Sequence, residues 1–158
     1  MDTLTFATLL TACAPLVHPV TARALVQVES GFNPHAIGVV AGALERQPRN
    51  VAEAQATAAA LEAGGRNFSL GLAQINVRNL PRLGLTIPSA LDSCRNLQAM
   101  QILLGECFER AGGAAAPQKN VRRALSCYYS GNFTTGVRQG YVDRVVAAAR
   151  PGPVRGPP

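Results

Sequence analysis

The sequence predicts a mainly helical protein with one domain over residues 1–150. Its 158 residues suit a single domain with its own hydrophobic core. Apolar residues recur at helical spacing in six segments, and each segment ends at a glycine or near a proline. No internal repeat and no linker divides the chain. Residues 151–158, rich in proline and glycine, are expected to form a disordered tail.

The predicted helices follow from this spacing and from signals at their ends. They are expected over residues 3–12, 20–30, 51–63, 94–111, 120–130 and 135–149. Asn50 has the character of an N-cap for the third helix, with Glu53 three residues later as in a capping box. A small β-hairpin is expected over residues 37–46, turning at Ala41 and Gly42.

The composition indicates a basic globular protein that binds an anionic partner. The formal net charge is +6, and Lys119 is the only lysine. A basic surface suits nucleic acid, an anionic membrane or an anionic polymer. The arginines are scattered and form no run, which argues against a nucleic-acid module. No apolar run approaches the roughly 20 residues of a membrane span, so stable membrane insertion is not expected.

Four cysteines predict two disulfides. Cys13, Cys94, Cys107 and Cys127 form no CxxC pair, which argues against a zinc site, and no other metal or cofactor site is expected. Two disulfides in a small basic domain indicate an oxidising compartment, with three pairings open. The alternative is four free thiols in a cytosolic protein. The start of the chain lacks a basic n-region and is not a signal peptide, so an exported protein would be represented here in its mature form with an added Met1.

Glu29 is the candidate catalytic acid. It is expected in the last turn of the helix over residues 20–30, just before the stop at Gly31. The negative end of the helix dipole, together with shielding by Leu25 and Val26 one turn back, would raise the pKa of this carboxyl. A carboxyl that stays protonated near neutral pH can donate a proton. The competing interpretation is an exposed helix-end glutamate.

Two further segments carry unexpected polar side chains. Gln74 and Asn76 are embedded in an apolar stretch that begins near Ser69, and buried amides require partners or a ligand. Tyr128 and Tyr129 precede a Ser-Gly-Asn turn at the end of another helix.

These segments, taken in order, carry a family resemblance over about residues 10–149. They read Val-Glu-Ser-Gly-Phe-Asn-Pro, Gly-Leu-Ala-Gln-Ile-Asn, Ser-Cys-Tyr-Tyr-Ser-Gly-Asn-Phe and Gly-Tyr-Val. The order resembles the lytic transglycosylase domain, closest to the VirB1-like branch that accompanies type IV secretion and conjugation machines. The resemblance implies a lysozyme-like helical fold of the goose-type class. It also implies cleavage of peptidoglycan between N-acetylmuramic acid and N-acetylglucosamine in the periplasm. A monomer is the default expectation.

The resemblance also implies roles for individual residues. Glu29 matches the single catalytic acid, and Gln74 matches the glutamine of the Gly-Leu-Met-Gln motif in the glycan cleft. Tyr128 matches the tyrosine of the Ala-Tyr-Asn motif, and Tyr141 matches a tyrosine near the catalytic carboxyl. Ser69 falls where many members keep a serine close to the acid. Asn76 and Tyr129 complete the expected substrate-binding set.

Two positions depart from the family pattern. Ala73 stands where the family usually has a methionine that packs on the sugar, which is expected to widen the cleft. Tyr129 stands where the family usually has asparagine, which puts a polar contact to the substrate in doubt. The resemblance further implies a Cys13–Cys94 disulfide, because VirB1-like relatives carry cysteines at these positions. That leaves Cys107 to pair with Cys127.

The predicted chemistry needs one carboxylate and no cofactor. An ordinary glycoside hydrolase uses two carboxylates, and Glu29 is the only acid in a motif segment. A transglycosylase closes a 1,6-anhydro ring instead of activating water. Two alternatives stay open: a lysozyme-type muramidase on the same fold, and a glycan-binding assembly module without catalysis. A nucleic-acid binder has no motif behind it.

Overall fold

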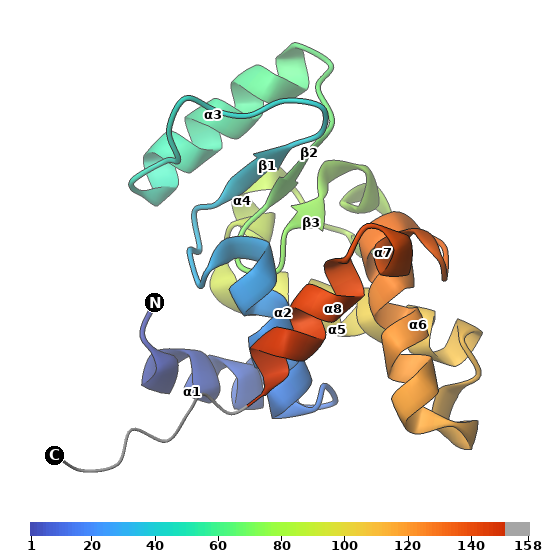
Figure 1. The fold of residues 1–158 in the computed structure, drawn as a ribbon. Helices are drawn as coiled ribbons and strands as arrows, with labels where there is room; N and C mark the ends of the chain where they lie inside the picture. The colour runs from blue at the N-terminus through green and yellow to red at the C-terminus, as the bar shows by residue number, and fades with distance from the viewer. Residues whose placement is uncertain (151–158) are drawn as a thin grey trace, which may run out of the picture. The chain divides into compact units, whose positions relative to one another are not determined.

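The computed structural model describes residues 1–150, and the predicted disordered tail, residues 151–158, lies outside the described residues (Figure 1). The described chain is mainly helical, with one small antiparallel sheet. The α-helices are α1 Thr3–Cys13, α2 Pro19–Ser30, α3 Val51–Ala63, α4 Ile87–Ala90, α5 Ser93–Arg110, α6 Pro117–Ser130, α7 Thr135–Arg138 and α8 Tyr141–Ala149. Short 3₁₀ helices are η1 Val77–Asn79, η2 Pro81–Leu83 and η3 Gly113–Ala115.

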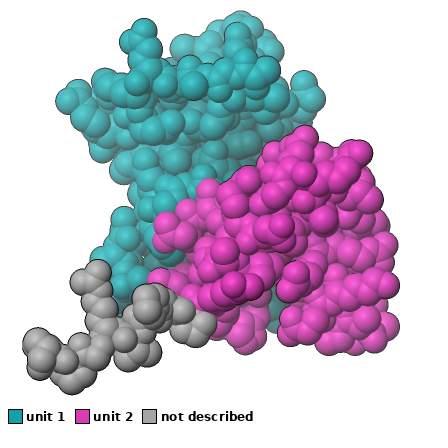
Figure 2. Space-filling model, viewed as in Figure 1, with its two compact units in different colours: residues 1–17, 29–102 teal, residues 18–28, 103–158 magenta. Residues whose placement is uncertain are grey.

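The chain divides into two compact units (Figure 2). Unit 1 comprises residues 1–17 and 29–102, and unit 2 comprises residues 18–28 and 103–158. Helix α2 therefore starts in unit 2 and ends in unit 1, and α5 starts in unit 1 and ends in unit 2. Glu29 is the residue at which the chain returns to unit 1.

Unit 1 contains the sheet, with strands β1 Ile37–Val39, β2 Phe68–Leu70 and β3 Ile75–Asn76 in the order β1-β2-β3. Both pairings are antiparallel. The strand residues Ile37, Phe68, Leu70 and Ile75 are buried, which anchors the sheet in the hydrophobic core. The sheet thereby holds the segment around Ser69 and Asn76 in a fixed register.

The predicted hairpin over residues 37–46 is wrong. Strand β1 pairs with β2, so that Gly38 of β1 lies opposite Ser69 of β2. The residues that follow β1 do not form a second strand beside it. Instead, the side chain of Gln47 completes the free edge of β1. Its Oε1 accepts from the N–H of Ile37 at 2.8 Å, and its Nε2 donates to the carbonyl of Ile37 at 2.9 Å. A carboxamide thus substitutes for the second arm of the hairpin.

The other predicted helices are present, although α6 begins at Pro117 and the short α4 was not predicted, and one predicted helix is divided. The predicted helix over residues 135–149 is two helices, α7 and α8, separated at Gln139 and Gly140. Gly140 has a φ of 73°, in the left-handed region that a continuous helix does not use. The break places Tyr141 at the start of a new helix.

The Asn50 cap of α3 forms as predicted, but the Glu53 side chain bonds to Arg46 and Arg49 and does not complete the capping box. Asn50 Oδ1 accepts from the N–H of Glu53 at 2.9 Å. The Glu53 carboxylate forms salt bridges with Arg46 at 2.8 Å and Arg49 at 3.0 Å. These hydrogen bonds, with that from the Arg49 N–H, lower the pKa of Glu53 to about 2. The loop before α3 is therefore tied to its first turn.

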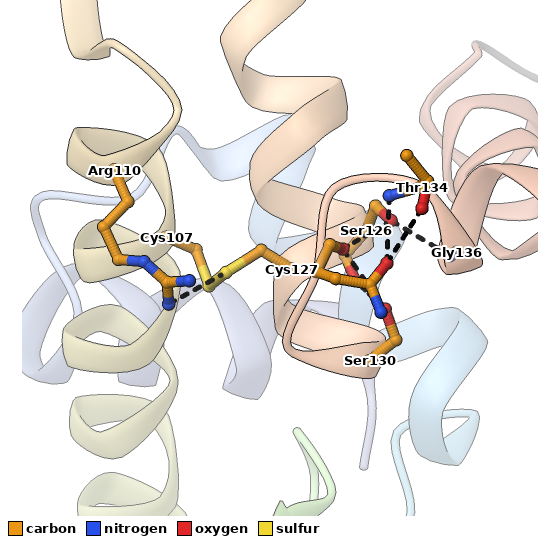
Figure 3. The surroundings of a disulfide bond; sticks show 8 residues. Cys107, Arg110, Ser126, Cys127, Ser130, Thr134 and Gly136 are labelled. Atoms are coloured by element: carbon orange, nitrogen blue, oxygen red, sulfur yellow. Dashed lines mark hydrogen bonds between the residues drawn. A yellow bond between two sulfur atoms is a disulfide. The ribbon is translucent and has the colours of Figure 1, made fainter.

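Both disulfides pair as predicted, and each lies within one unit. Cys13 at the end of α1 is bonded to Cys94 near the start of α5, in unit 1. Cys107 of α5 is bonded to Cys127 of α6, in unit 2. Arg110 lies beside the second disulfide, with its Nη1 3.6 Å from Cys127 Sγ (Figure 3).

Candidate active site

Glu29 lies at the predicted place, as the penultimate residue of α2, and it is half-buried. Gly31 and Phe32 follow with φ values of 58° and 63°, so the chain reverses sharply after the helix. The next side chain, Ser30, donates from Oγ to the carbonyl of Leu72 at 2.7 Å. This bond fixes the end of α2, and with it the backbone of Glu29, to the connection between β2 and β3.

Ser69 and Asn76 are brought together by the sheet register. They lie opposite each other in β2 and β3, and Asn76 Nδ2 is 3.3 Å from Ser69 Oγ. Asn76 Oδ1 accepts from the N–H of Arg78 at 3.1 Å, which starts the following 3₁₀ helix. The two ends of the Asn76 carboxamide are therefore engaged within the protein.

Gln74 holds the tight β2–β3 connection in shape. It has a φ of 50°, and its Nε2 donates to the carbonyls of Gly71 at 3.0 Å and Ala36 at 3.1 Å. A Cβ on Gly38 would lie 2.6 Å from Gln74 Oε1, so a larger residue at this position of β1 would displace the Gln74 side chain. The polar residue that the sequence singled out as a ligand group is thus also a brace of the turn.

Asn96 is a positioning residue that sequence reasoning missed. It is 1% exposed, and its Nδ2 donates to the carbonyls of Leu70 at 2.9 Å and Ala90 at 2.7 Å. Its Oδ1 accepts from the N–H of Ala73 at 2.8 Å. The only signal available in the sequence was an amide next to Leu97 in the apolar stripe of a long helix.

Ala73 belongs to the core of the structure. Its side chain has no exposed surface. Ala73 therefore does not line an open cleft in the way that the sequence led us to expect. Ala73 is instead part of the β2–β3 connection, and its backbone N–H donates to Asn96 Oδ1.

The three tyrosines of the predicted site lie in unit 2. Tyr128 is half-buried in the last turns of α6. Tyr129 and Tyr141 are stacked, with ring centroids 4.5 Å apart and planes 16° apart. The Tyr129 hydroxyl donates to Gln139 Oε1 at 2.8 Å. Gln139 is a second residue that the sequence did not indicate.

The turn after α6 is ordered by a buried serine (Figure 3). Ser126 Oγ donates to the carbonyl of Asn132 at 2.8 Å and accepts from the N–H of Gly136 at 2.9 Å. Asn132 Oδ1 accepts from the N–H groups of Thr134 at 3.1 Å and Thr135 at 2.8 Å. The Ser-Gly-Asn-Phe motif is thus a rigid connection between α6 and α7.

The described residues form neither a metal cluster nor a membrane span. Across residues 1–150, His, Cys, Asp and Glu side chains form no group of three or more that could hold a metal ion. No helix in the same range combines the length and the apolar character needed to cross a bilayer.

Comparison with known proteins identifies the family. The Transglycosylase SLT domain description matches residues 10–146. The type IV secretion system protein virB1 of Brucella abortus (strain 2308) is 50% identical over 151 residues, covering 91% of this chain and 63% of the relative. Protein virB1 of Agrobacterium fabrum is 40% identical over 139 residues, covering 87% of this chain and 56% of the relative. No solved structure matches.

The chain thus spans less than two thirds of the length of these curated relatives. The family match covers every predicted site residue, from Cys13 to Tyr141. It agrees with the mainly helical fold seen here and confirms the lysozyme-like fold class that the sequence predicted. The chain belongs to the transglycosylase SLT domain family.

Proposed function

We propose that this chain is a peptidoglycan lytic transglycosylase with Glu29 as its catalytic acid. It cleaves the β-1,4 bond between N-acetylmuramic acid and N-acetylglucosamine. The observation that carries the proposal is the 2.7 Å bond from Ser30 to Leu72, because it fixes the helix end bearing Glu29 to the connection that carries Gln74. Membership of the SLT family supports the same activity.

The reaction uses one carboxyl group twice. Glu29 first donates its proton to the glycosidic oxygen, and the bond between that oxygen and C1 of the muramic acid breaks. The Glu29 carboxylate then takes the proton of the same sugar's 6-hydroxyl, and the bond between O6 and C1 forms. The product is a 1,6-anhydro end and a free 4-hydroxyl, and no water is consumed. Glu29 returns to its protonated state.

Some of the remaining site residues hold the protein backbone in shape, and others are proposed to contact the glycan. Because Gln74 and Asn76 are engaged in internal hydrogen bonds, we assign them the role of holding the β2–β3 connection in shape. Ser69 lies in β2, next to that connection, as the partner of Asn76. Tyr128, Tyr129 and Tyr141 are the proposed glycan contacts from unit 2, following the family motifs.

The cellular setting follows from the relatives and the disulfides. The Brucella relative is named as a type IV secretion system protein, and we propose that this chain opens the cell wall for such an apparatus. Two disulfides suit the periplasm, which is an oxidising compartment. We propose that the enzyme acts there as a monomer.

Digestion of purified sacculi, followed by mass spectrometry of the soluble muropeptides, tests the proposal. The unmutated protein should release products with 1,6-anhydro ends, and Glu29→Gln should release none. Glu62→Gln, which neutralises an exposed acid on α3, is the matched control and should retain activity. Products heavier by about 18 Da, with reducing ends, would show a muramidase instead. Binding of sacculi without any product would show an assembly module.

A further inference from the structure

Tyr129 and Tyr141 form a stacked aromatic platform, in which a buried ring supports an accessible one. Tyr141 is 2% exposed, whereas Tyr129 is 42% exposed. Tyr141 therefore supports the inner face of Tyr129, which presents its remaining surface to solvent. An aromatic ring held in this way offers a flat apolar surface at low entropic cost, because its orientation is already fixed.

Gln139 organises this platform and a neighbouring cation at the same time. Its side-chain Oε1 accepts from the Tyr129 hydroxyl at 2.8 Å. Its backbone carbonyl accepts from Arg144 Nη1 at 3.3 Å, and the Arg144 guanidinium lies 5.9 Å from the Tyr141 ring centroid. The left-handed Gly140 makes this possible, because it turns the chain between α7 and α8. One residue thus contacts both the Tyr129 hydroxyl and the Arg144 guanidinium.

The net charge of the protein lies in this unit. Unit 1 contains six basic and six acidic residues, so its formal charge is zero. Unit 2 contains nine basic and three acidic residues, Arg155 of the tail included, so it carries the whole +6. An anionic ligand is therefore attracted to the unit that carries the platform.

We propose that Tyr129, Gln139 and Arg144 form a subsite for a sugar that carries a carboxylate. The C–H face of the pyranose packs on the Tyr129 ring, and the Arg144 guanidinium pairs with the carboxylate of the sugar's acidic side group. Tyr129 contributes its ring and not its hydroxyl proton, because Gln139 holds that proton. The inference rests on the proposed function, and it makes unit 2 select acidic peptidoglycan over neutral N-acetylglucosamine polymers.

Direct binding measurements with two glycan probes test this subsite. One probe is a soluble peptidoglycan strand whose stem peptides have been removed by an amidase, so that each muramic acid bears a free carboxylate, and the other is a neutral N-acetylglucosamine oligomer. All variants are made in the Glu29→Gln background, so that no cleavage is required. Arg144→Gln should weaken binding of the acidic strand about threefold to fivefold, as expected for an exposed charge pair, and leave the neutral oligomer unchanged. Arg122→Gln, which removes an exposed charge from α6, is the matched control and should change neither probe by as much.

Tyrosine variants separate the ring from its hydroxyl. Tyr129→Ala should weaken binding of both probes about tenfold through loss of stacking, whereas Tyr129→Phe should stay near the unmutated protein. Gln139→Ala should act like Tyr129→Phe on both probes, because each change removes the same hydrogen bond, keeps the ring on Tyr141 and leaves Arg144 its backbone acceptor. Thermal unfolding of each variant shows whether a loss of binding reflects a loss of fold.

Three results would overturn the subsite. These are equal effects of Arg144→Gln and Arg122→Gln, full binding by a folded Tyr129→Ala variant, and no binding of either probe by the parent protein. Cleavage of sacculi is measured separately in the Glu29 protein. If the protein with Glu29 intact cleaves no sacculi while the Glu29→Gln protein binds as described, the proposed function is refuted and the subsite is kept. Normal cleavage together with any of the three binding results would keep the proposed function and refute the subsite.

Discussion

Asn96 Oδ1 accepts a hydrogen bond from the backbone N–H of Ala73 at 2.8 Å. With its two donor bonds to Leu70 and Ala90, this side chain satisfies three backbone groups in the buried part of unit 1. The β2–β3 connection therefore takes its shape from α5 as well as from its own sequence.

Replacing Asn96 by leucine should destabilise the protein by about 3 kcal/mol, because buried backbone groups lose their partners. Urea unfolding followed by circular dichroism measures this loss. Asn50→Leu, which removes an exposed N-cap, is the comparison and should cost about 1 kcal/mol. Equal losses in the two variants would contradict a bracing role for Asn96.

Gly71→Ala should be more harmful than Gly65→Ala, although both glycines lie in unit 1 and have positive φ values. Gly71 has a φ of 76°, and a Cβ there would lie 2.5 Å from Asn96 Nδ2. The strained backbone and the clash together should cost about 2 to 4 kcal/mol. Gly65 has a φ of 65° but open space around it, so Gly65→Ala should cost about 1 kcal/mol. Similar unfolding midpoints for the two variants would show that the contact with Asn96 adjusts freely.

The two disulfides should contribute unequally to stability. Cys13–Cys94 spans 81 residues of sequence and Cys107–Cys127 spans 20. Chain-entropy arguments give about 4.5 kcal/mol for the longer loop and about 3.3 kcal/mol for the shorter. Denaturant unfolding of the two Cys→Ala double variants measures the difference. A larger loss from the Cys107/Cys127 variant would mean that strain or packing outweighs loop closure.

Glu53 should make stability depend on pH at the acid end. Its pKa falls from the ordinary 4.5 to about 2 in the folded protein, because Arg46 and Arg49 favour the charged form. A depressed pKa gives stability that is present above pH 4.5 and lost as the pH falls toward 2. Glu53→Gln should therefore be less stable than the unmutated protein at neutral pH, and the gap should close near pH 2.

Thermal unfolding across pH checks this, with Glu62→Gln at the other end of α3 as the control. A Glu53→Gln deficit that persists unchanged at pH 2 would assign the loss to the Asn50 cap or to packing and not to the ion pairs.

The sequence was sufficient where the information is local or carried by motifs. The position of Glu29 before Gly31 follows from helix periodicity and a glycine stop, and the structure has it there. The disulfide pairing followed from the family resemblance. The family motifs also predict Gln74, Tyr128 and Tyr141 as site residues, and their contacts to glycan stay predictions.

What the sequence could not predict depends on contacts between distant residues. Strand β1 pairs with residues 68–70, because Gln47 takes the place that a local hairpin arm would occupy. Asn96 and Ser126 have partners far from their own helices or across a turn, and nothing in a helical stripe marks an amide or hydroxyl as satisfied. The break at Gly140 is also tertiary in origin, since a single glycine is compatible with a continuous helix.

The Gln47 side chain has a consequence for the behaviour of the protein in concentrated solution. β1 is an edge strand, and the N–H and C=O of Ile37 point away from β2, where a strand of a second molecule could pair with them. Because Gln47 already occupies both groups, an incoming strand finds this part of the edge closed. The carboxamide thus blocks edge-to-edge pairing at Ile37 of β1.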